Sequence, residues 1–155
     1  MIVDERIITF INSLDTKNSE ILEDIEREAL ADNVPIIRRE MQSFLKVLLM
    51  VKKPMRVLEV GTAVGFSALL MSEYVPEECA ITTIENYEKR IPIARQNLSV
   101  QEREEITLLE GDAMDVLKHW KDRMILFYGC GERSVHSLSA GDTASACKGR
   151  YPCLG

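Results

Sequence analysis

Acidic, hydroxyl and glycine residues gather in the segment LEVGTAVGFS, residues 58–67. Gly61 and Gly65 permit a tight turn and a close approach of the backbone to a ligand, because glycine adopts positive φ without steric cost. A helix that begins near Gly65 directs its first N–H groups at any anion placed there. Glu59 comes just before this turn and Ser67 just after it. Carboxylate, hydroxyl and backbone N–H groups at one turn predict a site for a polar small molecule.

Two more acids stand at the ends of the next apolar segments. Glu85 ends ITTIE, about twenty residues after the glycine turn, where an acid in nucleotide-binding folds accepts hydrogen bonds from ribose. Asp112 lies in EGDA, residues 110–113, before a helical pattern. Each has a plainer explanation, since Glu85 can be a solvated strand end and Asp112 a helix cap. Their recurrence at successive strand ends favours one shared crevice.

The glycine spacing separates two cofactors. A dinucleotide fold wants G-x-G-x-x-G for its pyrophosphate, and GTAVGFSA lacks that spacing. S-adenosylmethionine has no pyrophosphate and needs an acceptor for its ribose and polar groups for its amino-acid end. Glu85, the Asp112 loop, Glu59 and Ser67 supply these groups.

The elements that position these residues follow from hydrophobic periodicity. We expect amphipathic helices at 4–14, 18–30 and 35–53, with Asp15 or Asn18 starting the second and Pro35 in the first turn of the third. Strands follow at 55–60, 80–85 and 106–112, alternating with helices at 66–75, 87–100 and 113–120. This alternation predicts an α/β fold whose parallel sheet has the order third, second, first, with helices on both faces. MILFY, residues 124–128, is expected as a fourth strand beside the first.

Composition sets the remaining limits. The chain has 155 residues, 46% hydrophobic and 28% charged, which suits one domain. Its net charge of -6 argues against a large nucleic-acid surface. We found no apolar run of membrane-span length and no signal-peptide pattern in MIVDERII, so we expect no membrane association and a cytoplasmic protein with reduced cysteines.

VLEVGTAVGFSALLMS, ITTIE and LLEGDA together resemble the metal-dependent class I O-methyltransferases related to catechol and caffeoyl-CoA O-methyltransferases. Within them the chain is most similar to bacterial tRNA 5-hydroxyuridine methyltransferases, and NVPII at 33–37 supports that match. The resemblance covers roughly residues 1–123. It implies a Rossmann-like S-adenosylmethionine methyltransferase fold, with tRNA or a small hydroxylated molecule as substrate and a homodimer as the assembly. The cofactor contacts that it implies are Ile37, Glu59, Gly61, Thr62, Gly65, Ser67, Glu85, Asp112 and Ala113.

The last 27 residues, 129–155, do not fit the family. The resemblance implies a fourth strand ending in a metal-binding acid, as DAAKGQY, with a later acid and amide completing a magnesium site; the chain lacks both. Permitted synonymous codons, read one base out of frame from Phe127, encode that motif, so our hypothesis is a frame slip between Asp122 and Phe127. We then expect N-terminal helices in 1–53, a truncated cofactor-binding core in 54–128, an out-of-frame disordered tail in 129–155, no metal site and no turnover. The catalytic residues stay unknown.

Three alternatives remain open. Zinc could bind the tail, but Cys130, Cys147 and Cys153 lack close paired spacing and His136 stands alone. A nucleotide-dependent oxidoreductase would retain a nicotinamide cofactor. A binding or scaffold protein would keep the fold without the chemistry.

Overall fold

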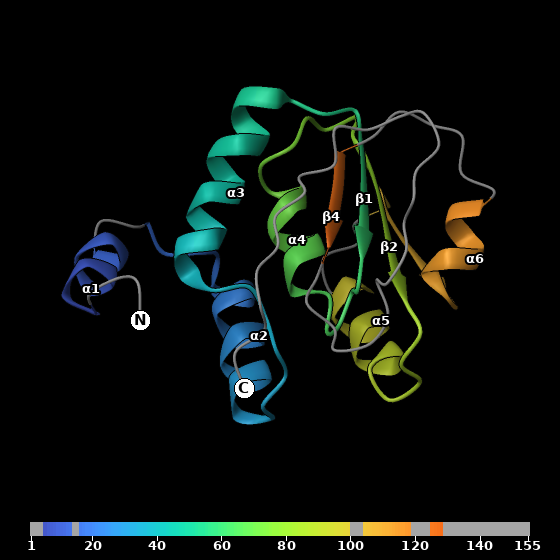
Figure 1. Ribbon diagram of the computed structural model, residues 1–155, viewed down its shortest axis with the longest axis horizontal. Coiled ribbons are helices and arrows are strands. Elements are labelled where there is room, and N and C mark those ends of the chain that lie inside the picture. Colours follow the sequence, from blue (N-terminus) through green and yellow to red (C-terminus); the bar gives the residue numbers. More distant parts are fainter. Residues whose placement is uncertain (1–4, 14–15, 100–103, 119–124, 129–155) are drawn as a thin grey trace.

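The computed structural model describes residues 5–13, 16–99, 104–118 and 125–128 (Figure 1). The tail, residues 129–155, lies outside these ranges, and so does part of the segment in which we placed the frame slip. Both the disordered tail and the frame slip therefore stay predictions. The elements, in chain order, are α1 (Glu5–Ser13), α2 (Glu20–Ala31), α3 (Arg39–Lys52), β1 (Arg56–Val60), α4 (Phe66–Ser72), β2 (Ala80–Glu85), α5 (Ile91–Ser99), β3 (Ile106–Glu110), α6 (Ala113–Lys118) and β4 (Ile125–Tyr128).

The four strands form one parallel sheet in the order β3-β2-β1-β4. This confirms the order expected from the sequence, including the fourth strand beside the first. Short apolar runs such as VLEV become strands because both faces of a parallel sheet are covered. In the register between β1 and β2, Glu59 lies opposite Thr83. The carboxyl ends of β1, β2 and β3 therefore meet at one edge of the sheet.

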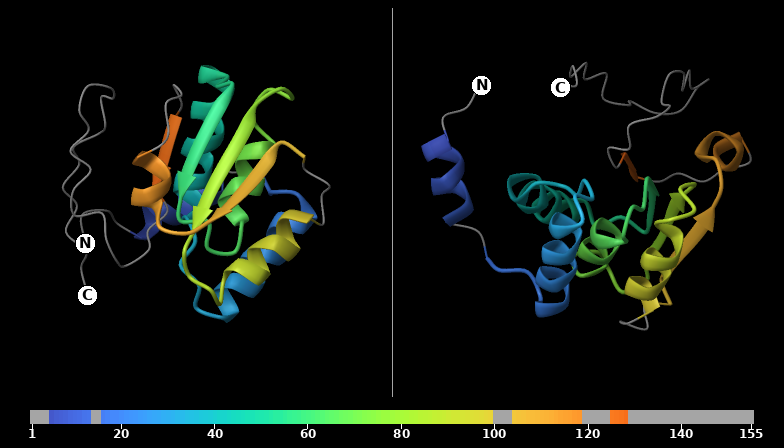
Figure 2. Two further views of the ribbon diagram at one scale, coloured as in Figure 1. Left: turned by 90° about the vertical axis from the view of Figure 1, so that its right-hand side faces the viewer. Right: turned by 90° about the horizontal axis from the view of Figure 1, so that it is seen from below.

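The helices lie in layers around this sheet. α2, α3 and α4 gather on one side and α6 lies on the other, while α1 lies beyond α3 and farthest from the strands (Figures 1 and 2). α5 packs against β3. No helix in the described part of the chain is both long and apolar enough to cross a bilayer.

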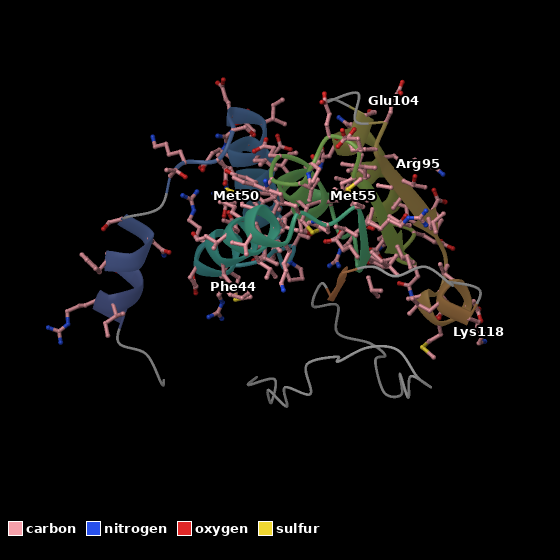
Figure 3. The ribbon with its side chains drawn as sticks, turned by 90° about the horizontal axis from the view of Figure 1, so that it is seen from above. Phe44, Met50, Met55, Arg95, Glu104 and Lys118 are labelled. Atoms are coloured by element: carbon pink, nitrogen blue, oxygen red, sulfur yellow. The ribbon has the colours of Figure 1, made fainter. Side chains whose placement is uncertain are left out.

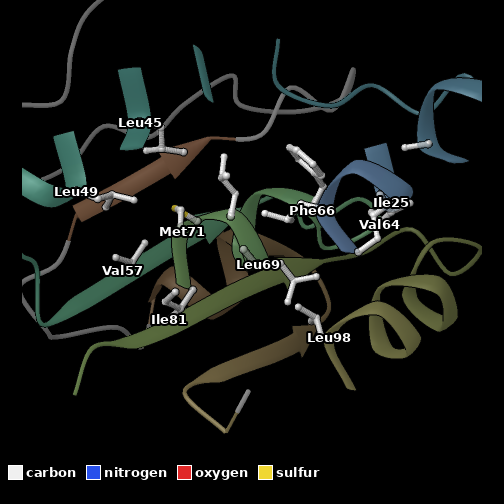
Figure 4. Close-up of a cluster of buried hydrophobic side chains, with 14 of the residues drawn as sticks. Ile25, Leu45, Leu49, Val57, Val64, Phe66, Leu69, Met71, Ile81 and Leu98 are labelled. Atoms are coloured by element: carbon white, nitrogen blue, oxygen red, sulfur yellow. The ribbon is translucent and has the colours of Figure 1, made fainter. Parts of the chain in front are cut away.

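A hydrophobic core fills the space between β1, β2 and the helices of the α4 side (Figure 4). Phe66, Leu69 and Met71 of α4 are fully buried at its centre. Leu22 from α2 and Leu49 from α3 pack into the same cluster. Burying each such side chain stabilises the fold by roughly 1.5–3 kcal/mol. The core thereby fixes α4, and with it the glycine turn at its start.

Three helix starts differ from the sequence-based expectation, and one of them is that of α5, which begins at Ile91 and not at residue 87. α3 begins at Arg39, so Pro35 lies in an extended connection and not in the first helical turn. Ile36 and Ile37 of that connection pack against the core. α2 begins at Glu20 after Ser19, which donates to Glu73 rather than capping its own helix.

Helical spacing predicts that α3 buries an apolar stripe made of Ile36, Met41, Phe44, Leu45, Leu48 and Leu49. The buried face of the helix differs from this stripe. Leu45 and Leu49 are buried as expected, but Met41 and Phe44 are exposed. Buried polar residues replace them: Gln42 donates to Glu26 at 3.0 Å and to the Ile37 carbonyl at 3.0 Å. A buried polar group is tolerated when it is hydrogen-bonded, so periodicity of apolar residues alone misplaced this face.

Candidate cofactor site

The turn of residues 61–65 follows β1 directly and bends sharply. Gly61, Ala63 and Gly65 have φ values of 95°, 50° and 86°. The N–H groups of Gly61 and Thr62 both donate to the Ile84 carbonyl of β2, at 2.9 and 3.1 Å. The turn is thus tied to the end of the neighbouring strand.

Gly65 is required for a second reason, because α5 passes close to it. A Cβ at this position would lie 3.3 Å from Leu98 Cγ and 3.6 Å from the Ala94 carbonyl oxygen. Asn97 of α5 donates through Nδ2 to the Val64 carbonyl at 2.8 Å. These contacts hold the turn against α5. The sequence did not predict a role for Asn97, because an asparagine within a helix carries no positional signal.

Glu85 ends β2, and its carboxylate accepts three backbone hydrogen bonds. Oε2 accepts from the N–H of Ala63 at 2.7 Å, and Oε1 accepts from Asn86 at 3.0 Å and Tyr87 at 2.9 Å. The side chain is 6% exposed. Glu85 therefore joins the glycine turn to the segment after β2.

Glu59 lies beneath the turn and is 1% exposed. Its two oxygens accept from different hydroxyls: Oε1 from Ser67 of α4, and Oε2 from Thr83 of β2 at 2.6 Å. Burial raises the pKa of Glu59 from 4.5 to about 7, the two hydroxyl donors oppose that rise, and the charge of Glu85 adds to it. Glu59 is thus a carboxyl group that changes charge near neutral pH.

The third strand end contributes Asp112, which is exposed. Its Oδ1 accepts from the N–H of Met114 at 2.7 Å, so it caps α6, which begins at Ala113. The N–H of Gly111 donates to the Glu85 carbonyl at 2.9 Å and holds this loop beside the end of β2. Asp112 and Ala113 therefore reach the same edge as Glu85.

Ile37 lies elsewhere in the chain, in the connection between α2 and α3. It is half-buried, packs against the hydrophobic core, and its carbonyl accepts from Gln42. The structure brings together Glu59, Gly61, Thr62, Gly65, Ser67 and Glu85 through the contacts above. It records no such link for Ile37, whose cofactor contact stays a prediction.

The metal site implied by the resemblance has no counterpart among the described residues. They contain no group of three or more histidine, cysteine or acidic side chains placed to hold an ion. Each oxygen of Glu59 and Glu85 already accepts at least one hydrogen bond from a hydroxyl or a backbone N–H. The described residues of this edge therefore do not fit a divalent metal.

Known proteins resemble this chain in sequence and in fold. A sequence profile of the O-methyltransferase family matches residues 12–127. The chain is 29% identical to a putative caffeoyl-CoA O-methyltransferase from Staphylococcus aureus, with a TM-score of 0.66 over 74% of this chain and 55% of that one. An O-methyltransferase from Bacillus cereus, solved in complex with S-adenosylhomocysteine (SAH), is 21% identical, with a TM-score of 0.68 over 80% of this chain and 60% of that one. The second likeness shows the fold alone.

A shorter match has higher identity. Over 65 residues the chain is 37% identical to protein-L-isoaspartate O-methyltransferase from Shewanella baltica. These 65 residues make up 42% of this chain and 29% of that enzyme. The chain therefore spans well under two thirds of the length of these relatives. Its parallel sheet and helices form the Rossmann-like fold of S-adenosylmethionine methyltransferases. With most of its described length inside the matched segment, the chain belongs to the O-methyltransferase family.

Proposed function

We propose that this chain binds S-adenosylmethionine, the cofactor from which its family transfers a methyl group to a hydroxyl oxygen, at the carboxyl ends of β1, β2 and β3. The observation that carries the proposal is Glu85, a nearly buried carboxylate held at a strand end by three backbone N–H groups. A carboxylate oxygen accepts two hydrogen bonds, so Oε2, which has one donor among the described residues, keeps a lone pair that none of them uses. That lone pair suits a ribose hydroxyl.

The remaining groups match the rest of the cofactor. The glycine turn lets the backbone approach the ligand, and Glu59 and Ser67 lie beside it with carboxylate and hydroxyl chemistry. When bound, S-adenosylmethionine supplies a methyl group activated by its positive sulfur. In an intact member of the family, the protein would orient that group toward the acceptor oxygen, and holding two reactants in line lowers the entropic part of the barrier.

For the acceptor we propose the wobble 5-hydroxyuridine of tRNA, supported by the sequence likeness of the segment that enters α3. A small catechol-like hydroxyl compound is the second candidate, supported by the structural likeness to a putative caffeoyl-CoA enzyme. We further propose cytoplasmic location, a homodimer, and cofactor binding without turnover by this chain. The described residues offer cofactor contacts, and they offer no group positioned as a base or metal ligand for the acceptor.

Calorimetric titration with SAH tests the cofactor assignment. We expect the full chain to bind SAH in preference to NADH. Preferential binding of NADH would instead indicate an oxidoreductase. Glu85→Ala should weaken SAH binding by about 1–3 kcal/mol, the usual worth of a hydrogen bond to a charged group. Glu85→Gln, which keeps one acceptor oxygen, should lose less.

Glu78→Ala is the matched control, because Glu78 is exposed and precedes β2 at the opposite end of the sheet. Its affinity should equal that of the wild type. Equal SAH affinity in Glu85→Ala would remove Glu85 from the site. Failure of the folded wild-type chain to bind SAH would contradict the proposed function itself.

A further inference from the structure

Three hydroxyls surround Glu59 in a buried chain of hydrogen bonds. Ser67 and Thr83 each contact one carboxylate oxygen, and the Oγ1 atoms of Thr83 and Thr62 lie 2.6 Å apart. Thr62 and Thr83 are buried, whereas Ser67 is half-buried. The chain of contacts thus runs from the glycine turn, through β2 and the end of β1, to the first turn of α4.

Counting protons fixes the direction of these bonds when Glu59 is ionised. An ionised carboxylate only accepts, and each hydroxyl has a single proton to donate. Ser67 and Thr83 both spend that proton on Glu59. The contact between the two threonines must then be a donation from Thr62 to Thr83. All three protons point inward, and Ser67 offers only lone pairs to a ligand.

Protonation of Glu59 reverses the direction of the hydrogen bonds on one of its two carboxyl oxygens. The new carboxyl O–H sits on one oxygen, and the hydroxyl bonded there must accept instead of donate. If that oxygen is Oε1, Ser67 regains a free O–H. If it is Oε2, Thr83 turns to Thr62, and Thr62 regains its own. Either way one hydroxyl at the turn changes from an acceptor to a donor.

We propose that Thr83 is a positioning residue of the cofactor site: its hydroxyl favours the ionised form of Glu59 and thereby keeps the half-buried Ser67 hydroxyl as an acceptor toward the ligand. The proposal rests on the proposed function, because the ligand is the amino-acid end of S-adenosylmethionine. Its ammonium group needs acceptors. Thr83 itself, fully buried behind Glu59, touches no ligand.

Opposing effects of burial, hydrogen bonding and charge set the balance between the neutral and the ionised form of Glu59. Burial alone pushes Glu59 toward its neutral form, and the donors from Ser67 and Thr83 oppose that push. Among the described residues, the charged group that acts on Glu59 is Glu85 of β2, which also favours the neutral form. Removing one donor should therefore tip Glu59 toward protonation at neutral pH.

The direct test is a titration of the Glu59 side-chain carboxyl by carbon-13 NMR in the full chain without ligand, with the resonance assigned by its loss in Glu59→Gln. In Thr83→Val, which keeps the side-chain shape, we expect the titration midpoint to rise by about one pH unit or more, since a hydrogen bond to the charged form favours that form. Thr83→Ser restores the hydroxyl and should restore the midpoint.

Thr82→Val is the control, because Thr82 is the adjacent residue on the opposite face of the same strand. It should leave the midpoint unchanged. Thr62→Val removes the donor behind Thr83 and should shift the midpoint upward by a smaller amount, which keeps the test decisive if Thr83→Val does not fold. An unchanged midpoint in the folded variants overturns the proposal.

A second reading separates this inference from the proposed function. The affinity for SAH should rise with pH through the Glu59 midpoint, and Thr83→Val should move that rise to higher pH. If the wild type binds no SAH while the NMR midpoint still shifts, the hydroxyl chain holds Glu59 but the cofactor assignment fails. If SAH binds with an identical pH profile in wild type and Thr83→Val, the cofactor assignment stands and the role of Thr83 is refuted.

Discussion

At the scale of single residues, Glu59 combines deep burial with a carboxyl group. Transfer of a carboxylate out of water is costly unless hydrogen bonds compensate, and here Ser67 and Thr83 provide that compensation only in part. The pKa of Glu59 is accordingly raised to about 7. The folded protein holds a proton that the unfolded chain, with an ordinary pKa of 4.5, would release.

This difference predicts how stability depends on pH. A folded-state pKa above the unfolded one gives stability that is full below pH 4.5 and lost as pH rises through about 7. The loss amounts to about 3 kcal/mol. Glu59→Gln cannot ionise, and its amide can donate to the Ser67 or Thr83 oxygen. Urea denaturation across this pH range should show the wild type losing stability relative to the variant. Parallel curves would show that Glu59 titrates normally.

The sequence predicted that Glu59, Ser67 and Glu85 lie near the glycine turn, but it did not predict the contact of Thr83 with Glu59. Glu59, Ser67 and Glu85 were predictable because acids and hydroxyls beside a glycine turn have few structural uses. Threonine in a strand is ordinary, since β-branched residues favour strands. Only the register, which sets Thr83 opposite Glu59, reveals its contact.

At the scale of elements, the glycine turn depends on both its neighbours. Its backbone is tied to β2 through Ile84 and to α5 through Asn97, so these two elements together set its shape. The alternation of strands and helices was predictable from periodicity. The start of α3 was not, because the connection before it is as apolar as the helix and is held by tertiary packing.

Two glycines with positive φ allow a paired test of this turn. Gly65→Ala places a Cβ 3.3 Å from Leu98 Cγ at φ 86°, whereas a Cβ on Gly111 at φ 138° meets nothing within 4 Å. Both substitutions place a side chain at a positive φ that residues other than glycine rarely adopt, which costs about 1–3 kcal/mol each. Gly65→Ala adds crowding against α5, so its urea midpoint should fall further than that of Gly111→Ala. Equal losses would mean that α5 yields freely at this point.

At the scale of the whole molecule, α3 presents an apolar face that the described residues leave exposed. Phe44 is 60% exposed, and Met50 lies on the same helix (Figure 3). The exposed apolar face of α3 also includes Met41, Val47 and Val51. Apolar patches of this kind mark contact surfaces or a tendency to associate.

We therefore expect concentration-dependent self-association of the purified chain. Replacing Phe44 and Val51 by lysine should shift light-scattering masses toward the monomer, because charges resist removal from water. Leu30→Lys, at an exposed apolar residue of α2, is the control and should change the mass little. A wild-type chain that stays monomeric at every concentration would contradict this expectation.

The three backbone donors on Glu85 also create a competition. Two hydroxyls of one ribose would bring five donors to a carboxylate with about four lone pairs. One backbone N–H, from Ala63, Asn86 or Tyr87, must then give up its bond as the sugar arrives. Its amide proton should move upfield in the spectrum of the SAH complex while the other two stay in place. Occupancy of the site would thus be recorded by the protein's own backbone, without a label on the ligand.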